Sequence, residues 1–155
     1  YSSAASDVYK RQLNGLAGAT LQRVGAGNDR LVGGAGDDLL IGGAGEDSLF
    51  GGAGADSFRF DGLADGGDGI ADFAPGQDLI LISATGFGGF LSTGVLAAGH
   101  FASDAPDAAV AQFVYSAASG VLAWDEDGTG AAAAVTLATL INRPALTADD
   151  LFVIA

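Results

Sequence analysis

Aspartate recurs every nine residues near the start of the chain, and glycines surround each of these aspartates. The units are VGAGNDRLV at 24–32, GGAGDDLLI at 33–41, GGAGEDSLF at 42–50 and GGAGADSFR at 51–59. The glycines permit backbone conformations with φ above zero and let carbonyl groups converge, and each aspartate adds a carboxylate. Oxygen ligands without His or Cys are typical of sites for hard cations such as Ca²⁺. The repeat therefore predicts calcium binding at its glycine-rich turns.

The predicted calcium ligands are backbone carbonyls of these turns together with the aspartate that ends each turn. One unit offers about three oxygens, whereas Ca²⁺ takes roughly six to eight, so two stacked turns must share an ion. Neighbouring strands lie about 4.8 Å apart, which brings stacked turns close enough to do so. The predicted ligand residues are Gly25, Gly27, Asp29, Gly33, Gly34, Ala35, Gly36, Asp38, Gly42, Gly43, Ala44, Gly45, Asp47, Gly51, Gly52, Ala53, Gly54 and Asp56.

The composition argues against several other functions. Nineteen acidic residues against six basic ones give a formal net charge of −13, which repels nucleic acid and anionic membrane surfaces. Gly or Asp interrupts the apolar stretches every few residues, so we expect no membrane insertion. With no Cys and one histidine, His100, the chain can build neither a His-paired zinc site nor a Ser-His-Asp triad. We therefore expect a binding protein without a catalytic site of its own.

The second half of each unit supplies the element that positions the turn. A large apolar residue points inward from a short strand while its neighbours point outward. A flexible glycine-rich linker would not keep an aspartate and an apolar residue in phase over four units. Asp37 and Glu46, at the fifth place of their units, are expected at a solvated edge with only their carbonyls available to an ion. The predicted core residues are Leu31, Leu40, Leu49 and Phe58.

The units GGAGDDLLI, GGAGEDSLF and GGAGADSFR resemble the GGxGxDxUx nonapeptide of the repeats-in-toxin family. The later segments GIADFAPGQDLILIS and FVYSAASGVLAWDEDGTGAAAAVTLATL are similar to regions that follow the repeats in serralysin-type and haemolysin-type calcium-binding proteins. The resemblance implies an all-β fold, with a short right-handed parallel β-roll in which two nonapeptides make one coil. Units n and n+2 then share an edge, so that Asp29 pairs with Asp47 and Asp38 with Asp56.

The resemblance also implies a role in secretion. Proteins of this kind leave the cell through a type I secretion exporter that binds an uncleaved C-terminal signal, and extracellular calcium then folds the acidic repeats. The expected partners are thus calcium ions and, transiently, the exporter; the oligomeric state stays open. Two alternatives stay open as well. The chain is the C-terminal tail of a secreted enzyme, such as a metalloprotease or lipase, or it is a fragment of a repetitive surface adhesin.

Three regions are predicted along the chain. Residues 1–12, YSSAASDVYKRQ, share nothing with the repeats and are interpreted as a non-native or disordered leader. Residues 13–73 are predicted to form the calcium-binding β-roll. Residues 74–155 are predicted to form a cap of antiparallel strands that ends in the secretion signal.

Several finer expectations concern the cap. Strands are expected at 70–73, 78–82, 112–115, 120–124, 133–137 and 151–154, with a short helix near 94–98 and a helical start at 146–150. The acidic segment 125–130 is similar to the start of an EF-hand loop, but no Glu follows at the twelfth place, so it is predicted to be a hairpin turn. Tyr115 and Trp124 are expected to pack inside the cap.

Two features of the acidic residues leave questions open. Val24 replaces the first glycine of unit one, so we expect the site of Asp29 and Asp47 to be weaker or to lack a ligand. Beyond the repeats, further aspartates either complete a terminal calcium site or form turns; these are Asp61, Asp65, Asp68, Asp72 and Asp78.

Overall fold

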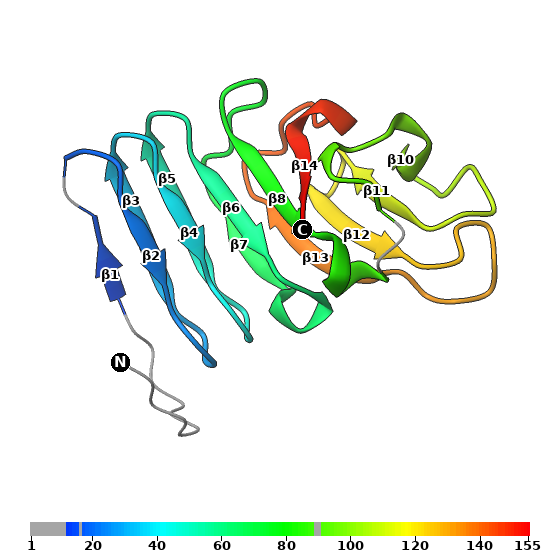
Figure 1. Cartoon of the computed structure of the whole chain (residues 1–155), viewed down its shortest axis with the longest axis horizontal. Helices are drawn as coiled ribbons and strands as arrows, with labels where there is room; N and C mark the ends of the chain where they lie inside the picture. Colours follow the sequence, from blue (N-terminus) through cyan, green and yellow to red (C-terminus); the bar gives the residue numbers. More distant parts are fainter. Residues whose placement is uncertain (1–11, 16, 89–90) are drawn as a thin grey trace.

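The computed structural model describes residues 12–15, 17–88 and 91–155, which form two β-sheets that face each other (Figure 1). Sheet A contains, in spatial order, β1 (Gln12–Asn14), β3 (Arg30–Ala35), β5 (Ser48–Ala53), β7 (Asp68–Ile70), β13 (Val135–Leu140), β12 (Val121–Asp125), β11 (Gln112–Ser116) and β10 (Phe101–Ser103). Sheet B contains β2 (Leu21–Arg23), β4 (Leu39–Ile41), β6 (Ser57–Phe60), β8 (Leu79–Ser83), β14 (Leu151–Ile154) and β9 (Gly94–Val95). The all-β prediction is confirmed.

The repeats form the predicted parallel β-roll. Successive short strands alternate between the two sheets, and each strand pairs in parallel with the strand two positions later. Arg30 pairs with Ser48 in sheet A, and Leu39 pairs with Ser57 in sheet B. Two nonapeptides therefore make one coil, and equivalent residues of units n and n+2 lie side by side.

The apolar residue of each unit points into the space between the sheets. Leu31, Leu40 and Phe58 are fully buried, and Leu49 is 2% exposed. Ile70 and Ile80 continue the same stack beyond the repeats and are also fully buried. Burial of such side chains stabilises the coil by about 1.5–3 kcal/mol each, which these short strands need because they make few hydrogen bonds.

The roll begins before the first recognisable unit, with β1 starting at Gln12, next to the predicted start at residue 13. Strand β1 pairs in parallel with β3, and β2 pairs in parallel with β4. Gln12 thus belongs to a strand, although the leader was predicted to include it; residues 1–11 lie outside the described residues. Gln22 occupies the inward position that Leu40 fills in the next coil and is 7% exposed. A segment that lacks the consensus residues can therefore join the roll by pairing with a regular coil beside it.

The cap continues both sheets of the roll rather than forming a separate layer. The predicted antiparallel pairs β11–β12 and β12–β13 are present. The turn 125–130 begins at the end of β12 and leads toward β13. However, β13 lies parallel to β7, and β14 lies parallel to β8. Strand β8 itself pairs in parallel with β6, so the register of the roll extends past the predicted boundary at residue 73.

Other elements of the cap differ modestly from expectation. The strand expected at 70–73 is wrong except at Ile70, because β7 covers Asp68–Ile70 and ends there. Instead of a helix near 94–98, the chain forms β9 and then the 3-10 helix η3 (Ala98–His100). Three more 3-10 helices are η1 (Leu63–Asp65), η2 (Ala84–Phe87) and η4 (Ala148–Asp150), the last matching the expected helical start.

Aromatic residues fill the interior of the cap, as predicted for Tyr115 and Trp124. The ring centroids of Phe113 and Trp124 lie 4.6 Å apart, and Phe87 meets Trp124 edge-on at 5.6 Å. The hydroxyl of Tyr115 donates a 2.8 Å hydrogen bond to the carbonyl of Pro144. These contacts anchor the end of the roll to a well-packed core.

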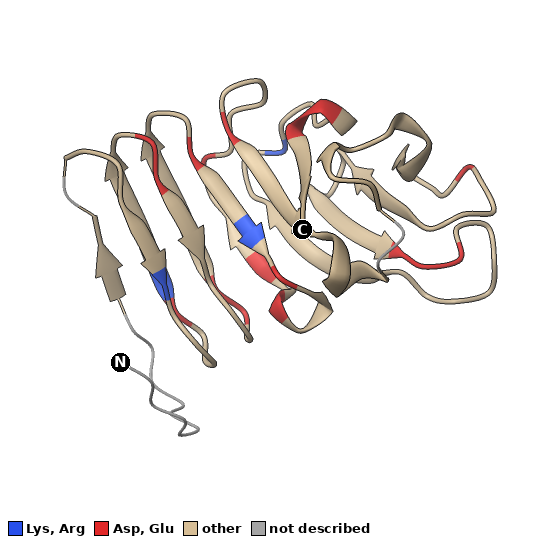
Figure 2. Ribbon diagram, in the orientation of Figure 1, with Lys and Arg blue, Asp and Glu red and all other residues tan. Residues whose placement is uncertain are grey.

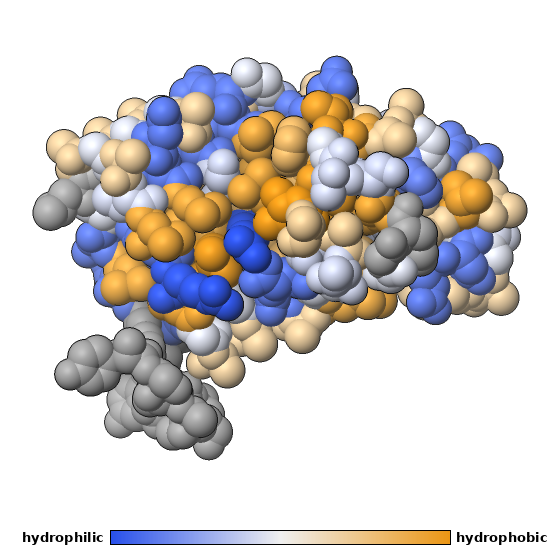
Figure 3. All heavy atoms as spheres, viewed as in Figure 1, coloured by the Kyte–Doolittle hydropathy of each residue, from blue (hydrophilic) through white to orange (hydrophobic). Residues whose placement is uncertain are grey.

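The outer face of sheet B carries apolar side chains interspersed with charged ones (Figure 3). Leu21 is 66% exposed and Phe152 is 36% exposed, whereas Ile41, which pairs with Arg23, is only 4% exposed. Within the described residues, no helix is long and apolar enough to cross a membrane.

Candidate metal centre

The turns of the roll form two rows, one along each edge, where acidic residues are concentrated (Figure 2). The Asp47 edge consists of the turns that enter sheet A, at 24–29, 42–47 and 61–68. The Asp38 edge consists of the turns that enter sheet B, at 17–20, 33–38, 51–56 and 71–78, of which 33–38 and 51–56 include the last three residues of β3 and β5. The repeat places one aspartate at the end of every regular turn, directly before a strand.

The side chains of Asp47 and Asp56 are each bonded to the backbone of the preceding coil. The Asp29 N–H donates to Asp47 Oδ1 at 2.7 Å, and the Asp38 N–H donates to Asp56 Oδ1 at 2.9 Å. The pairs expected from the family resemblance, Asp29 with Asp47 and Asp38 with Asp56, therefore lie on shared edges. These bonds form an aspartate ladder that links side chains to main chain between coils.

Two aspartates beyond the repeats extend the ladder. Asp68 Oδ1 accepts the Asp47 N–H at 2.9 Å, and Asp78 Oδ1 accepts the Asp56 N–H at 3.0 Å. Their turns are longer than the repeat turns, so the nine-residue step does not find them. In both, as in the repeats, a large apolar residue follows the aspartate by two positions, here Ile70 and Ile80, but Leu63 follows Asp61 in the same way, so this signal alone does not single them out.

Thr20 ends the ladder at the N-terminal end of the Asp38 edge. Its N–H and its hydroxyl both donate to Asp38 Oδ1, each at 2.7 Å. Sequence reasoning missed this residue, although it precedes Asp29 by the nine-residue step. A hydroxyl here supplies a donor to the last carboxylate of the row instead of adding another negative charge.

Two carboxylate oxygens in the ladder have no partner. Asp38 Oδ2 and Asp47 Oδ2 are buried and accept no hydrogen bond from the described residues, and both side chains belong to residues only 2% exposed. A buried charged oxygen without a partner is strongly unfavourable unless a cation lies against it. One such oxygen lies on each edge, so the donor set fits a hard cation at both.

The glycines of the turns make room for these oxygens. A Cβ at Gly33 or Gly42 would approach the Oδ2 atom of Asp38 or Asp47, respectively, more closely than 3.0 Å. A Cβ at Gly52 would approach the carbonyl oxygen of Gly34 in the preceding coil just as closely. Only glycine lets carboxylate and carbonyl oxygens crowd together at the edge in this way.

The glycine at the fourth place of each unit has a different role. Gly36 and Gly45 have φ values of 117° and 136°, a region that other residues rarely adopt. This conformation reverses the chain before the aspartate. Unit one departs from the pattern, because Val24 stands at the place of Gly33 and Gly42 and its side chain belongs to the hydrophobic core. Asp29 therefore lacks the space that Gly42 leaves for Asp47.

Backbone carbonyls must supply most of the ligands. Within the described residues, no three His, Cys, Asp or Glu side chains converge on one point. The alanine carbonyls predicted as ligands already accept bonds between coils: Ala44 O from the Gly27 N–H at 2.8 Å and Ala53 O from the Gly36 N–H at 2.7 Å. Each keeps one lone pair.

Burial and neighbouring carboxylates raise the pKa of aspartates in the ladder. Burial raises the pKa of Asp68 to about 8; the nearby charges of Asp47 and Asp65 add to the shift, while the hydrogen bond from the Asp47 N–H opposes it. Burial likewise raises the pKa of Asp47 and Asp56, again with neighbouring aspartates adding to the effect. A divalent cation at the edge opposes both causes.

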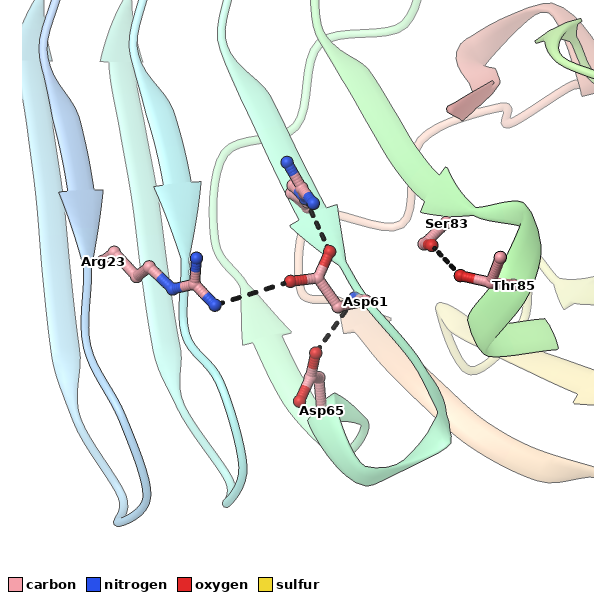
Figure 4. A network of polar contacts seen from close by, with 6 residues as sticks. Arg23, Asp61, Asp65, Ser83 and Thr85 are labelled. Atoms are coloured by element: carbon pink, nitrogen blue, oxygen red, sulfur yellow. Dashed lines mark hydrogen bonds and ion pairs between the residues drawn. The ribbon is translucent and has the colours of Figure 1, made fainter. Parts of the chain in front are cut away.

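Asp61 and Asp65 lie outside the ladder, where Asp61 faces Arg23 (Figure 4). Asp61 pairs with Arg59 at 2.6 Å and with Arg23 at 3.7 Å, and its N–H donates to Asp65 Oδ2 at 2.9 Å. The fifth-place residue Asp37 is exposed, as expected, but its Oδ1 accepts the Ala55 N–H at 2.8 Å. It therefore also helps to hold successive coils together.

The turn 125–130 is a hairpin turn, as predicted. Asp125 Oδ1 accepts the N–H groups of Asp127 at 3.2 Å and Gly128 at 2.8 Å. The aspartate at the start of the segment thus folds the local backbone.

Comparisons with known proteins agree with this geometry. A family model described as the RTX calcium-binding nonapeptide repeat, in four copies, matches residues 24–58. Among solved structures, the chain is similar to the AlgE6R3 subunit of the Azotobacter vinelandii mannuronan C5-epimerase, with 32% identity and a TM-score of 0.58 over 96% of this chain and 80% of that one. The AlgE6R2 subunit of the same enzyme matches with 25% identity and a TM-score of 0.49 over 94% of this chain and 93% of that one. No curated protein matches the chain.

Proposed function

The chain belongs to the RTX calcium-binding nonapeptide repeat proteins, and on this premise we propose that calcium drives the folding of its roll after secretion. Calcium binding itself follows from the family. Beyond calcium binding, we propose that the ions bind after secretion and that their binding folds the roll.

The observation that carries the proposal is the pair of unpartnered oxygens, Asp38 Oδ2 and Asp47 Oδ2. Each is buried in a stack of like charges, so the calcium-free roll bears an electrostatic cost at both edges. A bound cation offsets that cost, and the binding free energy then becomes folding free energy. Asp38 and Asp47 would hold the ions, together with Asp29, Asp56 and the glycine carbonyls of the turns. A bound calcium ion supplies positive charge and coordination between coils.

The expected affinity suits an extracellular ion. Modules that bind calcium outside cells have dissociation constants on the order of 10⁻⁴–10⁻³ M. At the much lower calcium concentration of a cytoplasm, these sites would be empty and the acidic repeats unfolded. An unfolded chain can pass through a type I exporter, and the calcium outside then folds it. We accordingly propose an extracellular location.

The C-terminal residues 149–155 are the proposed export signal. Their final location is compatible with that role, because Leu151 and Val153 of β14 are buried in the cap while Phe152 is partly exposed. A segment that passes the exporter unfolded can form this strand afterwards.

Circular dichroism with and without calcium tests the folding proposal. We expect β-structure to increase on adding Ca²⁺ and to increase less with Mg²⁺, whose small octahedral shell fits wide turns of carbonyls poorly. Adding a chelator should reverse the change. An identical β-rich spectrum in calcium and in chelator would contradict the folding proposal.

A second candidate function is favoured by the structural similarity. The AlgE6R3 subunit is part of a mannuronan C5-epimerase, so a roll of this kind accompanies an enzyme in that protein. This chain would in the same way be a non-catalytic calcium-binding tail of a secreted enzyme. The reading frame upstream of the chain tests this candidate: a catalytic domain there supports it, and further nonapeptides with no catalytic domain favour an adhesin.

A further inference from the structure

The last turn of the Asp38 edge, residues 71–78, is built differently from the repeat turns. Counted back from Asp78, Phe73 and Ala74 stand where the repeats have their first two glycines, and Gln77 stands at the fifth place. The side-chain amide of Gln77 donates to the carbonyl oxygen of Gly54 in the preceding coil. An amide hydrogen thus lies against an oxygen of the glycine-rich turn that it stacks on.

Both acidic residues of this turn are satisfied by backbone donors. Asp78 accepts the Asp56 N–H at 3.0 Å with Oδ1 and the Ala74 N–H at 2.8 Å with Oδ2. Asp72 accepts the Gly51 N–H at 3.0 Å and the Gly52 N–H at 2.8 Å, again with one bond to each oxygen. Every carboxylate oxygen of the turn therefore has a partner.

The cap holds the turn from the opposite side. Asp150 Oδ1 accepts the Gly76 N–H at 2.8 Å, and the side-chain amide of Asn142 donates to the Phe73 carbonyl at 2.7 Å. These two bonds link the turn to the segments around β13 and β14. The turn is fixed by hydrogen bonds on both sides.

The regular turns 33–38 and 42–47 present the opposite situation. In each of them one buried carboxylate oxygen, of Asp38 or Asp47, has no partner among the described residues. The carboxylates of Asp72 and Asp78 are satisfied by hydrogen bonds, whereas those of Asp38 and Asp47 each still require a positive charge.

We infer that the turn 71–78 is a metal-free closure of the roll and that calcium binds at the turns 33–38 and 42–47. The inference rests on the proposed calcium function and deepens it by assigning the ions to particular turns. Asp72, Asp78 and Gln77 perform with hydrogen bonds the linkage between coils that calcium performs at the regular turns. The calcium-free cap therefore offers a finished edge on which the repeats stack when calcium arrives.

Counting bound ions in variants of the full chain tests the assignment. Each protein is equilibrated with saturating calcium, checked for folding by circular dichroism, and analysed for bound calcium by equilibrium dialysis and atomic absorption. Asp38→Asn and Asp47→Asn should each lose one ion per chain relative to the wild type. Asp72→Asn and Gln77→Ala should keep the wild-type number and show a lower Tm by a similar amount with and without calcium. Asp61→Asn, on the outer face, is the matched control for loss of a charge.

The outcomes separate this inference from the proposed function. A wild-type chain that binds no calcium overturns the function itself. A wild-type chain that binds calcium but loses an ion in Asp72→Asn or Gln77→Ala overturns the metal-free closure. Full binding in both Asp38→Asn and Asp47→Asn overturns the assignment of the ions to those two turns.

Discussion

The backbone N–H of Asp29 lies 2.7 Å from the Oδ1 atom of Asp47, one coil further along the roll. This bond uses one oxygen of the Asp47 carboxylate and leaves Oδ2 buried without a partner in the described residues. The same side chain thus contributes to the fold with one oxygen and is available to a cation with the other. Under the proposed function, Oδ1 of this carboxylate serves the fold and Oδ2 binds calcium.

Aspartates on the same edge should act together. If Asp38 and Asp56 contribute to one site, the double variant Asp38→Ala/Asp56→Ala should lose little more calcium-dependent stability than either single variant. Asp38→Ala combined with Asp47→Ala, on opposite edges, should show nearly additive losses, each about 1–3 kcal/mol for a lost charged hydrogen bond. Calorimetric titration of the single and double variants measures this, and additive losses for the first pair would contradict the shared edge.

Glycines of the same repeat should differ in their tolerance of a methyl group. Gly33→Ala places a Cβ against Asp38 Oδ2 and the Gly51 carbonyl, so we expect a loss of about 1–3 kcal/mol and weaker calcium binding. Gly25→Ala is the matched control, because nothing lies within 4 Å of the added Cβ and its φ is not positive. Thermal unfolding with and without calcium compares them; equal losses in the two variants would refute the steric explanation.

Restoring the missing glycine of unit one should strengthen calcium binding. Val24→Gly removes a side chain of the hydrophobic core, so the calcium-free chain should lose about 1–3 kcal/mol of stability. It also opens for Asp29 the space that Gly42 leaves for Asp47, so the further stabilisation by calcium should increase. The measured quantity is the difference in Tm between calcium and chelator. Val24→Ala, which still carries a Cβ, is the control and should show no such increase.

The calcium-free chain should become less stable as the pH rises. The pKa of Asp68 is about 8 in the folded chain against an ordinary value of 3.8, so the folded state binds more protons than the unfolded state between these values. The contribution of Asp68 to the free energy of unfolding therefore falls from about pH 4 to about pH 8. Asp68→Asn, which cannot ionise, should show a shallower decline.

Calcium should reverse this dependence, because ligands must be deprotonated to bind the ion. Chemical denaturation across the pH range, in chelator and in calcium, measures both slopes. The explanation fails if wild type and Asp68→Asn have the same pH dependence in chelator.

Deleting residues 147–155 should reduce export through a matching type I exporter. The deletion also removes β14 and the bond from the Gly76 N–H to Asp150, so loss of folding has to be separated from loss of the signal. Asp150→Ala is the control, because it removes that bond and keeps the segment. The ratio of protein in the medium to protein in the cell should fall for the deletion alone; undiminished export of the deleted chain would overturn the signal interpretation.

The sequence by itself determined the repeating part of this protein. Glycines, an aspartate such as Asp38 and an apolar residue such as Leu40 recur at the same places of each nine-residue unit. They specify a turn, a carboxylate and an inward side chain in every unit, because each of these features depends only on residues within the unit. Those residues were enough to predict stacked turns, the buried apolar stack and the oxygen-rich edges, while the parallel arrangement of the coils followed from the family resemblance.

Only the tertiary structure decided which residues outside the regular units join the roll. Thr20 and Gln22 join the roll because the regular coil beside them offers hydrogen bonds and a surface to pack on, not because of their own pattern. Asp68 and Asp78 enter the ladder from turns of irregular length, while Asp61 turns outward to Arg59. All of these are acidic or polar residues that sequence cannot tell apart. Their roles depend on which backbone N–H of another coil lies within hydrogen-bonding distance, and the fold alone determines that.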